Sequence, residues 1–344
     1  MARISRLPSM VASLAAVALW FAAPAGAAFP GANGKIAFTD SNGRIAVINP
    51  DGTGFSEPGE ILGARPVWSS DGRKLAFQSD VGPPGCCGFN IVTMTAGGSD
   101  LRTLTHGIDA WDPTWSPDGT KLAYTDQSVG AIHVINADGT DDTRISPILI
   151  NDRQPTWSPD GTRIAISRDT ERPSQPRYAV YTIDPDGSDA TGLTERGIGL
   201  RNPAWTPDGS TISFTIGGFG GDFLADVWLM NADGSGQRRL DDLSVLRYEG
   251  PIAWSPDGSK IAFARYGSPC ASCSPTIYVA DANGEHARPL VVGEYPDWQP
   301  LQISVPPSSP RNRAAFCKGE RRRLGEAFAH TYRNLGRCVS ARRR

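Results

Sequence analysis

A segment of twelve residues recurs five times in this chain and constrains the fold more than any other feature of the sequence. The copies are PVWSSDGRKLAF (66–77), PTWSPDGTKLAY (113–124), PTWSPDGTRIAI (155–166), PAWTPDGSTISF (203–214) and IAWSPDGSKIAF (252–263). Their tryptophans, Trp68, Trp115, Trp157, Trp205 and Trp254, are 47, 42, 48 and 49 residues apart. A period of this length is typical of a β-propeller, in which each repeat forms one four-stranded blade.

The residues inside each repeat predict where its strands begin and end. Ser-Pro-Asp-Gly suits a type I turn, since Pro fixes φ at the second position and Gly relaxes the fourth. It would join a strand that ends near the Trp to the following apolar strand. A second segment, such as AIHVINADGTDDTRI, follows each copy, and its Asn-Ala-Asp-Gly turn leads from an apolar strand to a polar outer one. We therefore expect four antiparallel strands per repeat, with the tryptophans between neighbouring blades.

The two ends of the repeat region together predict a sixth blade. Before the first copy lies GKIAFTDSNGRIAVINPDGTG, which lacks the Trp-bearing strand, and after the last copy lies Tyr295-Pro-Asp-Trp298-Gln-Pro, which contains only that strand. Pairing the two would close the ring without exposed sheet edges. The expected fold is therefore an all-β, six-bladed propeller over residues 29–304, closed by its N- and C-terminal strands.

The repeat resembles the WD40-like (PD40) repeat of TolB-type propellers. The resemblance rests on Pro-x-Trp-Ser-Pro-Asp-Gly-x-x-Ile-Ala-Phe followed by Val-x-Asn-Ala-Asp-Gly, and it covers roughly residues 34–304. It implies the fold far more specifically than it implies a function, since one fold serves many functions. TolB proteins also carry an α/β domain ahead of the propeller, which we expect this chain to lack.

Both ends of the chain outside the repeats have separate predicted roles. Residues 1–28 read as a signal peptide, with Arg3 and Arg6 ahead of an apolar run that is too short to span a bilayer. We therefore expect the protein to be exported to the cell envelope, the periplasm or the medium, with no transmembrane segment in the mature chain. Residues 305–313 read as a Pro/Ser linker, and residues 314–344 as a basic, helical tail bracketed by two cysteines.

The distribution of charge excludes one class of partner. The formal net charge of −2 combines a net +2 from Arg3 and Arg6, a net −13 over residues 30–310 and a net +9 over residues 311–344. A nucleic-acid binder carries positive charge on its folded body, whereas this body repels phosphate. The basic tail could contact anionic envelope polymers or the acidic propeller itself, and solvated charge without a partner stays open as an alternative.

The candidate binding residues lie where the chain leads into each blade, at the expected channel mouth. They combine both charge signs with two aromatic side chains: Arg65, Asp109, Trp111, Asp112, Asp152, Arg153, Arg201, Asn202, Glu249, Tyr295 and Asp297. Variable loops on a rigid scaffold often carry recognition, so this set would suit a peptide or glycan of mixed polarity. Ordinary solvated loop residues are the alternative. No cofactor is expected, although a channel cation such as calcium stays open.

Six cysteines in an exported protein predict disulfides. Cys86 and Cys87 are adjacent, and Cys270 and Cys273 lie in the corresponding loop four blades on, so we expect two local bridges. A zinc site formed by these four would need a long reach across the ring. Cys317 and Cys338 could pair only if Gly325 breaks the tail helix into a hairpin, because bridged Cα atoms lie within about 7 Å. We expect this hairpin and a Cys317–Cys338 bridge, and pairing elsewhere is the alternative.

Motifs of common hydrolases are missing from the sequence. There is no Gly-x-Ser-x-Gly and no His-Glu-x-x-His, and the chain has four histidines in total. The many Asp-Gly pairs are accounted for by their turns. We therefore predict a binding platform rather than an enzyme, whose variable face binds a protein, peptide or cell-envelope glycan. A propeller hydrolase or lyase that acts on extracellular sugars or peptides, with acids in the channel, is the alternative.

Overall fold

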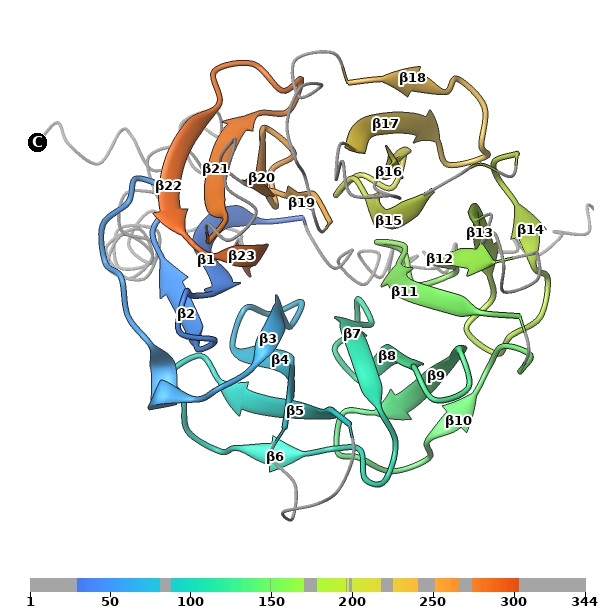
Figure 1. The fold of residues 1–344 in the computed structure, drawn as a ribbon, viewed down its shortest axis with the longest axis horizontal. Helices are drawn as coiled ribbons and strands as arrows, with labels where there is room; N and C mark the ends of the chain where they lie inside the picture. The colour runs from blue at the N-terminus through green and yellow to red at the C-terminus, as the bar shows by residue number, and fades with distance from the viewer. Residues whose placement is uncertain are drawn as a thin grey trace, which may run out of the picture.

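The chain folds into six β-sheets arranged in a ring around a central axis (Figure 1). This computed structural model describes residues 30–302 except 81–87, 149, 170–177, 196, 198–199, 218–224, 241–250 and 266–273. Five sheets have four antiparallel strands each, and the sixth has three. The predicted all-β, six-bladed propeller is confirmed.

Each blade runs from an inner strand at the channel to an outer strand at the circumference. Blade 1 contains β3 (Ala64–Trp68), β4 (Lys74–Ser79), β5 (Asn90–Thr95) and β6 (Arg102–Thr103); blade 2 contains β7 (Ala110–Trp115), β8 (Lys121–Asp126), β9 (Ala131–Asn136) and β10 (Thr143–Arg144). Blade 3 contains β11 (Asp152–Trp157), β12 (Ile164–Asp169), β13 (Tyr178–Ile183) and β14 (Thr191–Gly192); blade 4 contains β15 (Arg201–Trp205), β16 (Thr211–Gly217), β17 (Ala225–Asn231) and β18 (Arg238–Arg239). Blade 5 contains β19 (Ala253–Trp254), β20 (Lys260–Arg265), β21 (Thr276–Asp281) and β22 (Arg288–Val292).

Blade 6 is assembled from both ends of the described chain. Its strands are β23 (Glu294–Leu301), β1 (Ala32–Thr39) and β2 (Ile45–Ile48), and a short 3₁₀ turn, η1 (Pro58–Glu60), follows β2. β1 pairs antiparallel with β23, with Ile36 opposite Trp298. The Gln299 side chain also donates a 2.7 Å hydrogen bond to the Gly72 carbonyl in the first turn of blade 1. The ring is thus joined by backbone pairing within blade 6 and by side-chain bonds to its neighbour.

The repeated Ser-Pro-Asp-Gly turn is stabilised by its own side chains. In blade 2 the Gly119 N–H donates to the Ser116 carbonyl at 2.9 Å, which closes the turn. The Ser116 hydroxyl donates to the Asp118 carboxylate at 2.6 Å and accepts the Lys121 N–H at 2.9 Å. Gly119 has φ of 69°, where a residue with a Cβ is strained. The turn therefore starts the second strand of the blade at a fixed residue.

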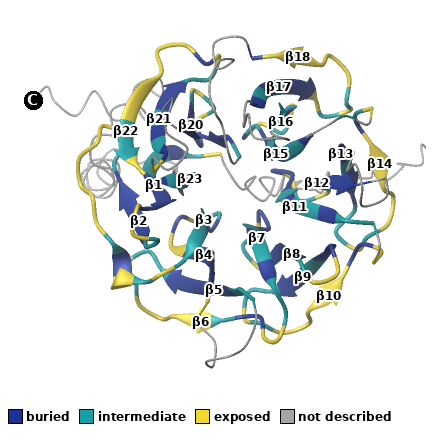
Figure 2. Cartoon of the chain, in the orientation of Figure 1, coloured by how far each residue is buried: buried dark blue, intermediate teal, exposed yellow. Residues whose placement is uncertain are grey.

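The hydrophobic core is divided among the junctions between blades. At the junction of blades 1 and 2, Trp115 packs with Leu122 and Tyr124 of its own blade and with Ala76 and Ile91 of blade 1. Equivalent clusters occupy the other junctions. Figure 2 shows buried residues on the middle strands and exposed ones on the outer strands. The expectation that the tryptophans lie between blades is therefore confirmed.

One junction between blades differs from the rest in the hydrogen bonding of its tryptophan indole N–H. The Trp254 indole donates to the Ser213 hydroxyl of blade 4 at 3.1 Å, and that hydroxyl donates to the Ala204 carbonyl at 3.2 Å. Ser213 stands where the other repeats have alanine. Within the described chain, the indole N–H groups facing those alanines are buried without a partner: Trp68, Trp115, Trp157, Trp205 and Trp298. A single hydroxyl therefore decides whether this buried donor is satisfied.

Introducing that hydroxyl at another junction should stabilise the protein. Ala76→Ser places an acceptor beside the Trp115 indole, and we expect a gain of about 1 kcal/mol in the free energy of unfolding, the usual net contribution of a hydrogen bond. The reverse change, Ser213→Ala, should cost about 1–3 kcal/mol because it leaves the Trp254 donor unpaired. Urea unfolding of both variants measures the two effects. A loss of stability in Ala76→Ser would show that the junction has no room for the hydroxyl.

Several predicted segments lie outside the described residues. These are the signal peptide (1–28), the linker (305–313), the tail (314–344) and all six cysteines, so the disulfide predictions stay predictions. Among the residues that are described, no helix is long and apolar enough to cross a membrane.

Candidate binding site at the central channel

The inner strands of the six blades surround a narrow cavity of about 130 Å³ on the ring axis. Counting back from each tryptophan, three layers of side chains line it. The rim ring, three residues before the tryptophan, contains Arg65, Asp112, Gln154, Asn202, Pro251 and Tyr295. The proline ring, two residues before, contains Pro66, Pro113, Pro155, Pro203, Ile252 and Pro296. The inner ring, one residue before, contains Val67, Thr114, Thr156, Ala204, Ala253 and Asp297.

A repeated backbone distortion positions the rim ring. Five of its six members have φ between 52° and 56°, a left-handed conformation that is rare for residues other than glycine: Arg65, Asp112, Gln154, Asn202 and Tyr295. Each lies at a β-bulge where the register of the inner strand shifts. The sixth member is Pro251, whose ring forbids positive φ. It directly follows residues 241–250, which are not described, and the described pairs of β19 and β20 are Ala253 with Ala262 and Trp254 with Ile261. Such strain is concentrated at functional sites in proteins, where it fixes the direction of side chains.

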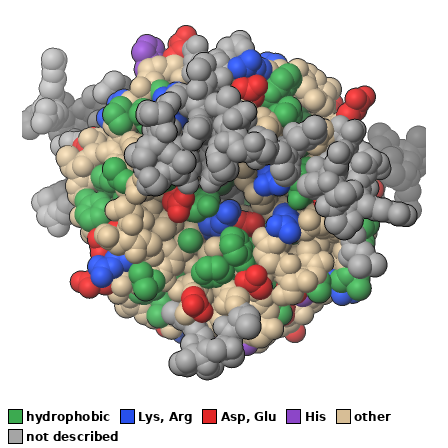
Figure 3. All heavy atoms as spheres, in the orientation of Figure 1, with side chains coloured by type: hydrophobic (Ala, Val, Ile, Leu, Met, Phe, Trp, Pro, Cys, Tyr) green, Lys and Arg blue, Asp and Glu red, His purple; other side chains and the backbone are tan. Residues whose placement is uncertain are grey.

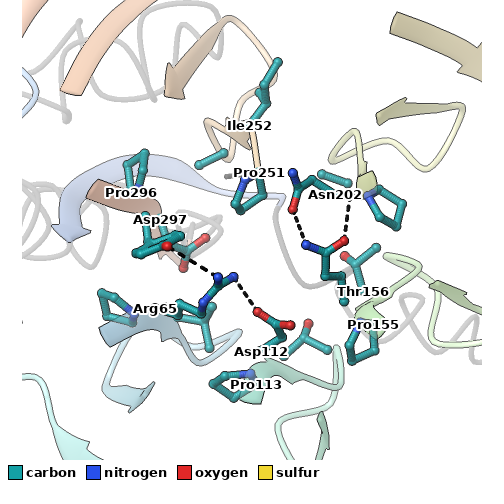
Figure 4. A pocket seen from close by; sticks show the side chains of 18 of the residues that line it. Arg65, Asp112, Pro113, Pro155, Thr156, Asn202, Pro251, Ile252, Pro296 and Asp297 are labelled. Carbon is teal, nitrogen blue, oxygen red and sulfur yellow. Dashed lines mark hydrogen bonds and ion pairs between the residues drawn. The ribbon is translucent and has the colours of Figure 1, made fainter. Parts of the chain in front are cut away.

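Charged and aromatic groups occupy one side of the rim. The Arg65 guanidinium donates to the Asp112 carboxylate at 2.5 Å and to the Tyr295 hydroxyl at 3.3 Å. It also lies over the rings of Tyr295, at 4.2 Å from the centroid, and Trp111, at 5.7 Å. Burial opposes the charge on Arg65, but its interactions with Asp112, Tyr295 and Glu294 together outweigh burial, so the pKa of Arg65 is raised. Figure 4 shows this pair projecting toward the channel axis.

Two amides occupy the opposite side of the rim. The Gln154 side chain donates to the Asn202 side chain at 2.6 Å and accepts the Asn202 backbone N–H at 3.0 Å. Its carbonyl oxygen also accepts the Ser167 hydroxyl at 3.2 Å. The rim therefore presents an ion pair with aromatic rings on blades 6, 1 and 2, and neutral amides on blades 3 and 4. Basic and acidic side chains gather around the centre of the face seen in Figure 3.

Deeper in the channel lies the carboxyl group of Asp297. Its Oδ2 accepts the Trp68 backbone N–H at 2.7 Å, across the junction of blades 6 and 1. Burial raises its pKa to about 7, and the backbone N–H groups of Trp68 and Trp298 offset this only in part. The corresponding position in the other repeats holds a neutral side chain. The channel is thus marked at one junction by an acid that titrates near neutral pH.

The predicted site residues fall into three groups. Arg65, Asp112, Asn202, Tyr295 and Asp297 all line the cavity, although on inner strands rather than on the loops expected. Four others are held beside the mouth by neighbours: Asp109 accepts the Trp111 indole N–H at 2.7 Å, Arg153 donates to Asn151 at 2.7 Å, and Arg201 lies over Tyr178 at 4.8 Å.

The remaining two predicted residues, Asp152 and Glu249, have different outcomes. Asp152 is fully buried and accepts two hydrogen bonds from Arg168, at 2.7 and 2.8 Å, so it supports blade 3 and cannot face a ligand. Glu249 lies outside the described residues. Sequence reasoning also missed Gln154, whose repeat position matches that of Arg65 and Asp112.

The described residues offer no cluster typical of a metal site, since no three His, Cys, Asp or Glu side chains converge there. The cavity carries two carboxylates, and Asp112 already pairs with Arg65. A divalent cation such as calcium takes six to eight oxygen ligands. The calcium alternative for the channel therefore gains no support from these side chains.

A six-bladed propeller with a polar-rimmed axial channel is the class of protein that these features define. Residues 65–301 match the family model described as the TolB beta propeller domain, so the chain belongs to that family. Among solved structures, TolB from Acinetobacter baumannii is similar with a TM-score of 0.63 and 18% identity, over 79% of this chain and 68% of that one. A chain of a nidogen/laminin complex is similar with a TM-score of 0.60 and 12% identity, over 78% of this chain and 99% of that one. At these identities the structures support the fold alone, and no curated protein matches the sequence.

Proposed function

We propose that this protein is an exported binding platform that holds a protein, peptide or cell-envelope glycan on the channel face of its propeller. The observation that carries the proposal is the rim ring, where five strained residues from separate blades direct polar side chains to one axis. Backbone strain repeated at one level of the ring is costly, at about 1–3 kcal/mol per residue, and strain of this kind is typical of residues whose side chains are held for a function.

The size of the cavity indicates how a ligand would bind. Pockets that enclose a whole small molecule have volumes of about 300–1,000 Å³. At about 130 Å³ this cavity holds a side chain or a chain end. The rest of the ligand would lie on the surrounding face, where Trp111, Arg153 and Arg201 are partly exposed. A narrow anchor in a broad polar face favours a macromolecular ligand over a metabolite.

The test removes the rim ion pair without changing the net charge. The double variant Arg65→Gln/Asp112→Asn should lose saturable binding of a partner captured from an envelope extract and re-measured with purified components. The matched control is Arg163→Gln/Asp189→Asn, which removes an exposed pair of 2.7 Å on blade 3, in the turns at the opposite ends of the strands. Equal binding by both variants, or release of small products instead of retention, would overturn the platform and favour a hydrolase or lyase.

A further inference from the structure

The channel below the rim contains one acid without a cationic partner among the described residues. Its ionisable lining side chains are Arg65, Asp112, Tyr295 and Asp297. Arg65 and Asp112 neutralise each other at 2.5 Å. The hydrogen bonds to Asp297 come from backbone N–H groups, which carry no net charge. Ionised Asp297 therefore gives the cavity a net negative charge.

The walls around this acid are apolar and narrow. Five prolines and Ile252 form the layer above it, and Val67, Ala204 and Ala253 share its own layer with two threonines. Figure 4 shows Pro113, Pro155, Pro296 and Ile252 of this layer around the axis. A group that reaches Asp297 must therefore be slender, and most of its contacts along the way are with carbon atoms.

We propose that the channel is an anchor pocket for a primary ammonium group on an aliphatic stem, with the Asp297 carboxylate as its counter-ion. The inference rests on the proposed binding role and specifies the chemistry of the group that would enter the channel. The stem would lie against the proline ring, and the ammonium would donate to Asp297.

An ammonium fits this acid better than a guanidinium does. A guanidinium binds carboxylates through two parallel hydrogen bonds and so needs both oxygens free. Here Oδ2 already accepts the Trp68 N–H at 2.7 Å. An ammonium is a compact point charge that needs a single carboxylate oxygen and can donate its other protons to neighbouring acceptors. The hydroxyls of Thr114 and Thr156 lie in the same ring and are such acceptors.

Proton release from Asp297 should be coupled to binding. The pKa of Asp297 is raised by burial to about 7, so the acid is mostly neutral at pH 6 and mostly ionised at pH 8. The other ionisable groups that line the channel are the Arg65–Asp112 pair and Tyr295. Because an alkylammonium stays charged over this range, its affinity should rise about tenfold from pH 6 to pH 8.

The experiment titrates the full-length protein with n-butylammonium and follows the tryptophan indole resonances by NMR. Uncharged n-butanol has the same aliphatic stem and is the control for binding through the stem alone. Asp297→Asn keeps the shape of the side chain and should weaken n-butylammonium binding at least about tenfold at pH 8. The matched variant is Asp138→Asn, which removes one carboxylate from an exposed turn where blade 5 already has Asn283. It should bind as the wild type does.

In these titrations, three results would overturn the inference: no binding of n-butylammonium by the wild type, equal binding of n-butanol, or unchanged n-butylammonium binding by Asp297→Asn. Putrescine and a lysine amide capped at its N-terminus then separate a free diamine from a lysine side chain as the source of the ammonium. The platform is tested independently, because a partner lost in the rim variant but retained in Asp297→Asn would leave the proposed function standing and reject the ammonium anchor.

Discussion

Replacing Arg168 with methionine is expected to destabilise the propeller by about 3–5 kcal/mol, the cost of leaving a buried charge without its partner. Arg168 donates two hydrogen bonds to Asp152, which is fully buried at the start of β11. The two residues face each other across β11 and β12, and the guanidinium also lies over the Tyr181 ring at 4.8 Å. Methionine keeps much of the aliphatic stem of arginine, so the loss in the free energy of unfolding reports mainly the removal of the charged group. Urea unfolding at pH 7.5 measures it.

Two further variants make this result interpretable. Arg163→Met removes an arginine from the same blade whose ion pairs, to Asp184 at 3.1 Å and Asp189 at 2.7 Å, are solvent-exposed. Such pairs contribute at most about 1 kcal/mol, so its effect should be small. Asp152→Leu combined with Arg168→Met should recover most of the stability, because no unpaired charge is left. If Arg168→Met were no worse than Arg163→Met, the buried pair would have no special role in blade 3.

The fold could be predicted from the sequence because the residues that determine each blade lie close together in the sequence and recur in every repeat. Each copy of Pro-x-Trp-Ser-Pro-Asp-Gly specifies one strand end, one turn and one strand start, and the turn bonds of Ser116 and Asp118 involve residues two to five apart. The tryptophan of each repeat, such as Trp115 in blade 2, packs at the equivalent junction because its position is fixed relative to the turn. The five copies therefore predict the same local structure independently, so a wrong interpretation of one copy does not change the prediction for the other four.

The site was harder to predict because it depends on pairs of residues that are distant in sequence. A residue before proline normally avoids helical and left-handed backbone, so nothing local indicated that Arg65 or Asp112 would form a bulge within a strand. The burial of Asp152 depends on Arg168, on the next strand. Repeat alignment could have found Gln154, which stands three residues before its tryptophan as Arg65 and Asp112 do.

Asp297 is the clearest case of a residue whose chemistry comes from the assembled ring. It closes the junction between the last strand and the first complete blade, and its carboxyl lines the channel and accepts the Trp68 backbone N–H. An acid with a pKa of about 7 binds its proton more tightly in the folded state than in the unfolded state, where the pKa is close to 3.8. Ionisation is therefore unfavourable to the native fold, the reverse of the usual surface aspartate.

The exposed aspartates in the turns behave in the usual way, because their ionised form stabilises the folded state. The hydroxyl and backbone N–H of Thr140 donate to Asp138 and lower its pKa. Its ionised form favours the folded state, and that contribution is lost as the pH falls through its folded pKa. Asp138→Asn should therefore bring no gain in stability at pH 8, which makes it a control for removing a negative charge.

Asp297→Asn is expected to stabilise the protein at neutral and alkaline pH by up to about 4 kcal/mol, at 1.36 kcal/mol per pKa unit. Below about pH 4 the carboxyl is protonated in both states, so the variant and the wild type should unfold alike. Between pH 4 and 7 the unfolded wild type releases its proton while the folded one retains it, so wild-type stability falls and the advantage of asparagine grows. Above pH 7 the advantage should be constant. Urea midpoints at pH 4 and pH 8 measure it, and a lower midpoint for Asp297→Asn at pH 8 would mean that the ionised carboxylate itself holds blades 6 and 1 together.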